Sequence, residues 1–213
     1  MSEPRPNVHV VDHPLMRHHL THLRSCETTP IQFRAHVRRL ASLLAYEATQ
    51  DLEEKPHEIQ TPLTTMTGSV VSSTIGLIPI LRAGLGMVEP VLDLLPDAQV
   101  WHLGLYRNEE TAQPVHYYSK LPPGQPVDVA LILDPMLATG GSAIAALDTL
   151  TRWGVPRIKL VSIIAAQAGI EAVSEVYPQT DIHVCAVDPE LNASKFIVPG
   201  LGDAGDRTFN TVG

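Results

Sequence analysis

Residues 129–142 read Val-Ala-Leu-Ile-Leu-Asp-Pro-Met-Leu-Ala-Thr-Gly-Gly-Ser, an apolar run followed by an acidic residue and a glycine-rich turn. The unbroken apolar run Val129 to Leu133 is typical of a parallel strand that is covered on both faces. After the turn, Ile144, Leu147 and Leu150 recur at helical spacing and predict a helix over residues 142–153. The sequence here predicts a strand, a turn and a helix in direct succession.

The same alternation extends on both sides of this stretch. Apolar runs predict strands over residues 75–81, 100–105, 129–133, 159–164 and 182–187, and helical patterns cover residues 83–95, 142–153 and 170–176. Alternation of this kind favours an α/β protein with a doubly wound, mostly parallel sheet. We therefore expect one domain over residues 1–213, with its α/β core at 74–187.

The segments that flank this core have different patterns. Helices are predicted over residues 15–25 and 30–50, and Pro30 suits the first turn of the second one. Residues 51–73 are polar and are expected to be irregular, as are the last 25 or so residues. We expect residues 8–73 to form a helical attachment and residues 188–213 a loop region, both outside the core.

The composition limits the classes of function. The chain of 213 residues has 15 basic and 23 acidic side chains, a net charge of −8 and a pI of about 5.6, which disfavours a general nucleic-acid binder. Its apolar runs are too short for a membrane span, and its start lacks the apolar segment of a signal peptide. Cys26 and Cys185 cannot form a disulfide framework. A cytoplasmic protein without membrane or nucleic-acid partners is expected.

The turn after Leu133 offers groups suited to a sugar phosphate. Thr139 and Ser142 supply hydroxyls, and the glycines between them supply backbone N–H groups at the start of a helix, where phosphates bind readily. Asp134 ends the strand and suits paired hydroxyls such as those of a ribose. Ligands of open α/β sheets bind at this end of the strands. An ordinary turn with a capping Ser or Thr is the alternative interpretation.

Residues 200–205 match the spacing GxGxxG but not its usual context. A dinucleotide fingerprint opens a helix and is followed by an acidic residue about 20 positions later, whereas only residues 206–213 follow here. We interpret this run as a loop whose backbone approaches a ligand closely.

Two arginines and one pair of histidines carry weaker signals. Arg82 and Arg107 each follow a predicted strand, and each is either a phosphate-binding arginine or an ordinary surface charge. His18 and His22 share a helix face, but no third ligand accompanies them and no metal site is predicted.

Four stretches together resemble the uracil phosphoribosyltransferase family, a type I phosphoribosyltransferase family. They are residues 79–87 (PILRAGLGM), 106–111 (YRNEET), 134–142 (DPMLATGGS) and 198–207 (VPGLGDAGDR), and the likeness runs from about residue 8 to the end. The resemblance implies a phosphoribosyltransferase-like α/β fold with N-terminal helices and a C-terminal hood over the base. It also implies the conversion of uracil and PRPP (5-phospho-α-D-ribose 1-diphosphate) to UMP and diphosphate, a pentosyl transfer in pyrimidine salvage.

The resemblance also implies roles for individual residues. It assigns catalytic roles to Asp203 and Arg107. Because the reaction needs water excluded from the site, we also expect the loop at residues 106–120 to act as a lid. The PRPP-binding residues that the resemblance implies are Arg82, Arg107, Asp134, Pro135, Met136, Leu137, Ala138, Thr139, Gly140, Gly141, Ser142 and Asp203. Its uracil-binding residues are Ile197, Gly202, Asp203 and Ala204. Magnesium is implied, bound mainly through the PRPP diphosphate, together with GTP as an effector and a homodimer or higher homo-oligomer.

The chain departs from the family pattern at three places. Phe196 stands where the family commonly has Tyr, residues 166–169 read Ala-Gln-Ala-Gly in place of Ala-Pro-Glu-Gly, and residues 188–192 read Asp-Pro-Glu-Leu-Asn in place of Asp-x-Gly-Leu-Asn. The alternative function is a PRPP- or pyrimidine-sensing regulatory protein with little turnover. The intact base loop favours the enzyme, and the net charge disfavours an RNA-binding regulator.

Overall fold

A parallel sheet forms the centre of the computed structural model, which describes residues 7–107, 114–119 and 121–211. The strands follow the order β1 (Val8–Val10), β11 (Asp181–Asp188), β10 (Arg157–Ala166), β8 (Val129–Leu133), β4 (Ile75–Pro79) and β5 (Gln99–Val100). The short β9 (Met136–Leu137) also pairs with β10. All these pairings are parallel, as the alternation predicted.

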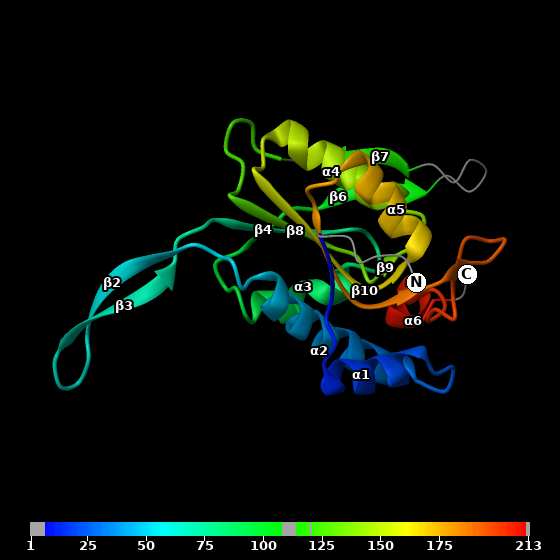
Figure 1. The fold of residues 1–213 in the computed structure, drawn as a ribbon, viewed down its shortest axis with the longest axis horizontal. Helices are drawn as coiled ribbons and strands as arrows, with labels where there is room; N and C mark the ends of the chain where they lie inside the picture. The colour runs from blue at the N-terminus through cyan, green and yellow to red at the C-terminus, as the bar shows by residue number, and fades with distance from the viewer. Residues whose placement is uncertain (1–6, 108–113, 120, 212–213) are drawn as a thin grey trace.

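Helices cover both faces of this sheet (Figure 1). One face carries α1 (Pro14–Arg24), α2 (Pro30–Ala48) and α3 (Leu85–Leu92), and the other carries α4 (Gly141–Trp153) and α5 (Gln167–Val176). Along β8, Leu131 and Leu133 belong to the first hydrophobic core while Ala130 and Ile132 belong to the second. The doubly wound fold is thus confirmed, and β8 has the predicted boundaries.

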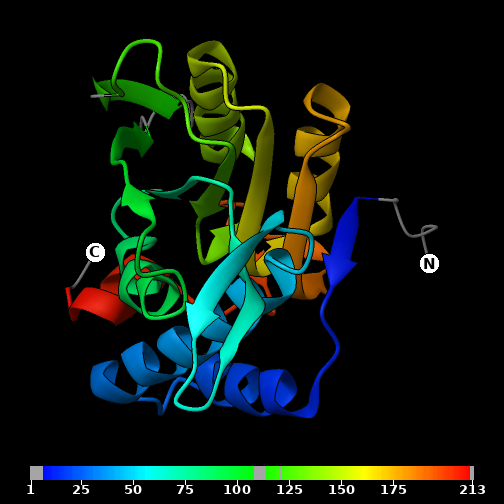
Figure 2. The same cartoon turned by 90° about the vertical axis from the view of Figure 1, so that its left-hand side faces the viewer.

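The N-terminal segment belongs to the core, contrary to the prediction that it lies outside. β1 pairs with β11 at one edge of the sheet, next to the orange strand in Figure 2. Phe33, Leu40 and Leu44 of α2 are fully buried in the core that also contains Leu131. The reason is that a parallel sheet has two apolar faces, and α4 and α5 cover only one of them.

Residues 51–73 were expected to be irregular, and this prediction was wrong. They form a hairpin of β2 (Glu54–Gln60) and β3 (Thr65–Val71), which extends away from the body of the molecule (Figures 1 and 2). The Thr61 hydroxyl accepts hydrogen bonds from the N–H groups of Leu63 and Thr64 at the turn. Pro56 and the charged residues of β2 lowered its apparent strand propensity, but a two-stranded hairpin consists of edges, where such residues are tolerated.

The strand predicted over residues 100–105 is divided between two sheets. β5 ends at Val100, and β6 (Leu103–Arg107) pairs antiparallel with β7 (Pro114–Ser119). Val100 of β5 and Leu103 of β6 are both apolar, so the apolar pattern could not show the change of partner.

The C-terminal region also has more structure than expected. β12 (Glu190–Leu191) pairs with β13 (Ile197–Val198), and α6 (Ala204–Phe209) follows them. The Asp203 carboxylate caps α6 by accepting a hydrogen bond from the Asp206 N–H at 2.9 Å. These elements were too short for a periodic pattern to reveal.

Candidate active site

The glycine-rich turn after β8 forms a phosphate-sized cradle at the carboxyl end of the sheet. Gly140 adopts a φ of +84° just before α4, a conformation that favours glycine. Asp134 and residues 136–143 line a small cavity of about 100 Å³ there. The first N–H groups of α4 and the hydroxyl residues Thr139 and Ser142 therefore border one space, as the sequence predicted.

Asp134 lies at the entrance to this cradle. Its Oδ1 atom accepts a hydrogen bond from the N–H of Met136 at 3.3 Å. Burial raises the pKa of the Asp134 carboxyl to about 7, and the bond from Met136 only partly opposes this rise. A carboxyl group with this pKa changes its charge near neutral pH.

The loop after β4 packs against the end of β8. A β-carbon built on Gly84 would lie 2.3 Å from the carbonyl oxygen of Leu133, so the backbone at residue 84 reaches the strand end only because glycine is there. Two residues before Gly84, the Arg82 side chain contacts the C-terminal region. The Arg82 Nη2 atom lies 3.0 Å from Asp206 Oδ1, and Nη1 lies 3.4 Å from the Thr211 hydroxyl. Arg82 is 59% exposed and is thus available to solvent and ligands.

The C-terminal loop follows a sharply turned path between β13 and α6. Gly200 has a φ of +61°, and a β-carbon there would lie 2.0 Å from the carbonyl oxygen of Ile197. Gly202 has a φ of +77°. Ile197 and Ala204 are buried, whereas Gly202 and Asp203 are exposed. The glycines therefore permit a tight backbone path, while the expected close approach to a ligand stays a prediction.

The glycine-rich cradle and the C-terminal loop share a second cavity, of about 220 Å³. Met136 and Ala138 border it on one side, and Asp203 and Ala204 border it on the other. Segments separated by more than 60 residues in sequence thus converge on one space. Ile197 and Gly202 are not among its lining residues, so only part of the predicted uracil set faces it.

Further residues line this shared cavity without having been predicted as site residues. They are Ala83, Ser194, Lys195 and Gly205, and Phe196 also lines it. Phe196 had been noted only as a departure from the family pattern. The sequence carried no signal for Lys195, which adopts a φ of +64° and supplies a positive charge.

The remaining predicted residue, Arg107, ends β6, but its side chain lies outside the part of the chain that the structure describes. The predicted lid at 106–120 corresponds to the β6–β7 hairpin, and its residues 108–113 and 120 also lie outside the described residues.

The histidines of α1 and α2 gather at the surface without forming a metal site. The ring centroids of His18 and His22 lie 4.8 Å apart, and His36 stacks on His22 at 5.1 Å. Within residues 7–107, 114–119 and 121–211, no group of three His, Cys, Asp or Glu side chains is arranged to hold a metal ion. Nor does any helix in that part of the chain combine the length and the apolar character needed to cross a membrane.

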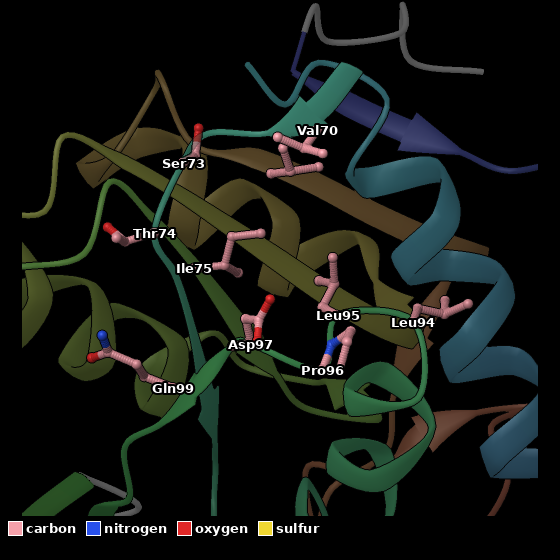
Figure 3. A pocket seen from close by; sticks show the side chains of 11 residues that line it. Val70, Ser73, Thr74, Ile75, Leu94, Leu95, Pro96, Asp97 and Gln99 are labelled. Carbon is pink, nitrogen blue, oxygen red and sulfur yellow. The ribbon is translucent and has the colours of Figure 1, made fainter. Parts of the chain in front are cut away.

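A separate cavity of about 320 Å³ lies near the opposite edge of the sheet (Figure 3). Its lining includes Val70 at the base of the β2–β3 hairpin, Ile75 at the start of β4, and Leu94 and Leu95 after α3. Ligands of α/β sheets bind at the carboxyl ends of the strands, and this cavity lies at the start of β4, away from those ends.

The fold is a doubly wound α/β sheet whose glycine-rich turn and C-terminal loop border one cavity. The sequence model of the family "Uracil phosphoribosyltransferase" matches residues 10–211. A uracil phosphoribosyltransferase from Roseiflexus castenholzii is 55% identical over 96% of this chain and 98% of its own length, and one from Symbiobacterium thermophilum is 50% identical over 95% and 97%. The chain belongs to the uracil phosphoribosyltransferase family.

A solved structure supports the fold independently. The AQ2163 protein from Aquifex aeolicus superposes with a TM-score of 0.90 at 36% identity, covering 95% of this chain and 97% of that one. The parallel sheet and the loops at its carboxyl edge are therefore similar to those of an experimentally determined protein.

Proposed function

We propose that this uracil phosphoribosyltransferase, which forms UMP and diphosphate from uracil and PRPP, holds PRPP at residues 134–142 and uracil against residues 197–204. The observation that carries the proposal is the shared cavity, bordered by Met136 and Ala138 on one side and by Asp203 and Ala204 on the other. A reaction that joins the base to the ribose needs its two substrates side by side in such a space.

The PRPP cradle orients the sugar. The N–H groups at the start of α4 and the hydroxyls of Thr139 and Ser142 suit the 5-phosphate. Asp134 accepts hydrogen bonds from the ribose hydroxyls once its carboxyl is ionised. Pro135, Met136, Leu137 and Ala138 shape the wall of the cradle. Orientation of this kind lowers the barrier by replacing an encounter in solution with a fixed geometry.

The leaving diphosphate accumulates negative charge as the anomeric C–O bond breaks. Arg82 is exposed. It also lies beside the C-terminal loop, where a β-carbon on Gly205 would lie 3.7 Å from Arg82 Nη2 and 3.2 Å from Asp203 Oδ1. Arg82 and Arg107 stabilise this charge, because a guanidinium bonds two oxygens of a phosphate at once. Protein positive charge placed at developing negative charge is a large source of catalysis.

The residues of the site also fit a magnesium ion carried by the PRPP diphosphate. Carboxylate oxygens are ligands that Mg²⁺ prefers, and the Asp203 carboxylate borders the shared cavity. The ion supplies further positive charge to the diphosphate, and Asp203 would hold it through water. A carboxylate is a weak base for the N1 proton of uracil, which favours this role over direct proton abstraction.

Uracil selection is assigned to backbone groups at Ile197, Gly202 and Ala204. Cytosine reverses the donor and acceptor pattern at position 4 of the ring and would leave buried groups unpaired. The test is UMP formation from uracil in a panel of nucleobases with PRPP and Mg²⁺. Equal turnover of cytosine, or a preference for hypoxanthine, would reject the assignment. The regulatory alternative predicts ligand binding with almost no product.

Arg107 can be tested in the same assay. Arg107→Ala should lower kcat/KM for PRPP by roughly 10²-fold or more, as expected for the loss of one charge-stabilising donor. Arg107→Lys should recover only part of it, because the planar fork is lost. Wild-type PRPP kinetics in the alanine variant would remove Arg107 from the site.

A homodimer or higher homo-oligomer is part of the proposal. Each residue of β2 is exposed, and Ile59, Met66 and Val70 lie on one side of the hairpin together with Lys55 and His57, which gives this side exposed apolar groups. A two-stranded hairpin is only marginally stable alone in water, so a partner surface for this side is expected. Light scattering after size exclusion tests the assembly, and Met66→Lys should weaken it. A wild-type monomer at micromolar concentration would contradict it.

Two further proposals concern regulation and location. GTP is proposed as an effector from the family resemblance, and UMP formation with and without GTP tests it. The cytoplasm is proposed as the place of action because the free cysteines Cys26 and Cys185 suit a reducing compartment. Fractionation of the source cells tests this location.

A further inference from the structure

A buried ion pair holds both polar backbone groups of Gly200. The guanidinium of Arg24 donates to Asp188 Oδ1 and Oδ2 at 2.7 Å each and to the carbonyl oxygen of Gly200 at 2.7 Å. The N–H of Gly200 donates to Asp188 Oδ2 at 3.0 Å. The two side chains are only 22% and 5% exposed. The pair thus acts as a clamp on one residue of the C-terminal loop.

The clamped residue lies in the middle of the proposed uracil-binding segment. Gly200 stands between Ile197 and Gly202, at a φ of +61° and with its backbone tight against the Ile197 carbonyl. Rotation at this position would move the backbone on both sides of it. The groups that are proposed to read uracil therefore depend on the orientation of the Gly200 peptides.

A second arginine ties the next residue of the loop to the same helix end. Arg207 donates to the carbonyl oxygen of Leu201 at 2.8 Å and to those of Leu23 and Ser25 at 2.7 and 2.6 Å. Its guanidinium also lies 4.4 Å from the centre of the Phe33 ring. Hydrogen bonds thus anchor residues 200 and 201 to the end of α1, which lies more than 170 residues away in sequence.

We propose that Arg24 and Asp188 are positioning residues that set the affinity for uracil by fixing the Gly200 peptides. The inference rests on the proposed assignment of residues 197–204 to uracil. Backbone groups can discriminate a base only if they are held in place, because a loop that relaxes can satisfy a different donor and acceptor pattern. Neither side chain lines the shared cavity, so the effect passes through the backbone of the loop.

The interaction of position 24 with Asp188 and Gly200 requires the guanidinium of an arginine. An arginine presents a planar fork that bonds both carboxylate oxygens and, here, a carbonyl as well. A lysine at position 24 keeps the positive charge but offers a compact ammonium without that fork. Arg24→Lys should thus preserve the ion pair while loosening the hold on Gly200.

The test compares steady-state constants of Arg24→Met and Arg24→Lys, well below their unfolding temperatures. We expect KM for uracil to rise about ten-fold or more in Arg24→Met and less in Arg24→Lys. We expect kcat and KM for PRPP to stay within about three-fold, because the PRPP cradle is built from other segments. Arg17→Ala is the matched control, since it removes an exposed ion pair with Asp12 on the same helix.

The outcomes separate this inference from the assignment on which it rests. If both KM values change alike, or only the unfolding temperature falls, the pair is merely structural and the inference is overturned. An unchanged KM for uracil in both Arg24 variants also overturns it. Gly202→Val tests the assignment itself: if it leaves KM for uracil unchanged, the loop does not bind the base. If Gly202→Val raises that KM and Arg24→Met does not, only the clamp is rejected.

Discussion

A β-carbon built on Gly169 would lie 2.4 Å from the carbonyl oxygen of Ala138. Gly169 belongs to the first turn of α5, and Ala138 belongs to the glycine-rich turn that is proposed to bind PRPP. The two backbones touch only because residue 169 has no side chain. The start of α5 is thus a support behind the cradle.

Gly169→Ala should displace this turn and impair PRPP binding. A shift of about 1 Å in a substrate-positioning segment can cost roughly 10²-fold, so we expect a fall of that order in kcat/KM for PRPP. Gly68→Ala is the control, because its β-carbon would only come 3.8 Å from a carbonyl oxygen in the exposed hairpin. If Gly169→Ala retained wild-type PRPP kinetics, the supporting role would be rejected.

Asp203→Asn should separate catalysis from stability. The Asp203 carboxylate caps α6 through the Asp206 N–H, and asparagine caps helices about as well as aspartate does. We therefore expect a near-normal unfolding temperature with a fall in kcat of about 10²-fold, since the charge is lost. Asp203→Ala should lose about 1 kcal/mol of stability as well. Wild-type kcat in Asp203→Asn would leave only the loop backbone as functional.

PRPP binding should depend on the charge of Asp134. Its pKa is raised to about 7, chiefly by burial, so the carboxyl is mostly neutral at pH 6 and mostly ionised at pH 8. The ionised form accepts hydrogen bonds from the ribose hydroxyls, so it should bind PRPP more tightly.

Calorimetric titration of PRPP into the wild type and Asp134→Asn measures this effect. Ionisation of PRPP itself is the same for both proteins, so the difference between their affinities isolates the carboxyl. That difference should widen as pH rises through 7. A difference that is independent of pH from 6 to 8 would contradict the prediction.

His183 should make the folded protein less stable in mild acid. The side chain is buried and stacks on His9 with the ring centroids 4.6 Å apart. Burial, followed by the charges of His9 and Lys159, lowers the pKa of His183 to about 4. The unfolded chain binds a proton near pH 6.5 and the folded chain only near 4, so the free energy of unfolding should fall as pH drops between these values.

The raised pKa of Asp134 acts in the opposite direction between pH 7 and pH 4, so the contribution of His183 is the difference between the wild type and His183→Gln. Urea unfolding of both proteins from pH 7 to pH 4 measures it, and the wild type should lose on the order of 3 kcal/mol more than His183→Gln, which lacks the titrating group. His102→Gln, at an exposed position, should leave the pH dependence of the wild type unchanged. Equal slopes in the wild type and His183→Gln would show that burial of His183 does not govern the effect.

The alternating core and the cradle at its edge could be predicted from the order of the residues. Val129 to Leu133 could be predicted to the residue because a strand buried on both faces must be continuously apolar. The turn from Asp134 to Ser142 could be placed at the carboxyl edge because it lies between that strand and a helix. Strands and helices can be predicted in this way because the apolar side chains of neighbouring residues follow the periodicity of the local backbone.

The tertiary structure alone decided which distant segments meet. Arg24 and Asp188 are 164 residues apart, and neither stands out in its own neighbourhood. The pairing of β1 with β11 and the division of β5 from β6 depend on backbone hydrogen bonds, which leave no trace in the order of apolar and polar residues. The packing of α1 and α2 against the sheet brings the end of α1 to the C-terminal loop, so the segment proposed to bind uracil acquires its supports only when the whole chain has folded.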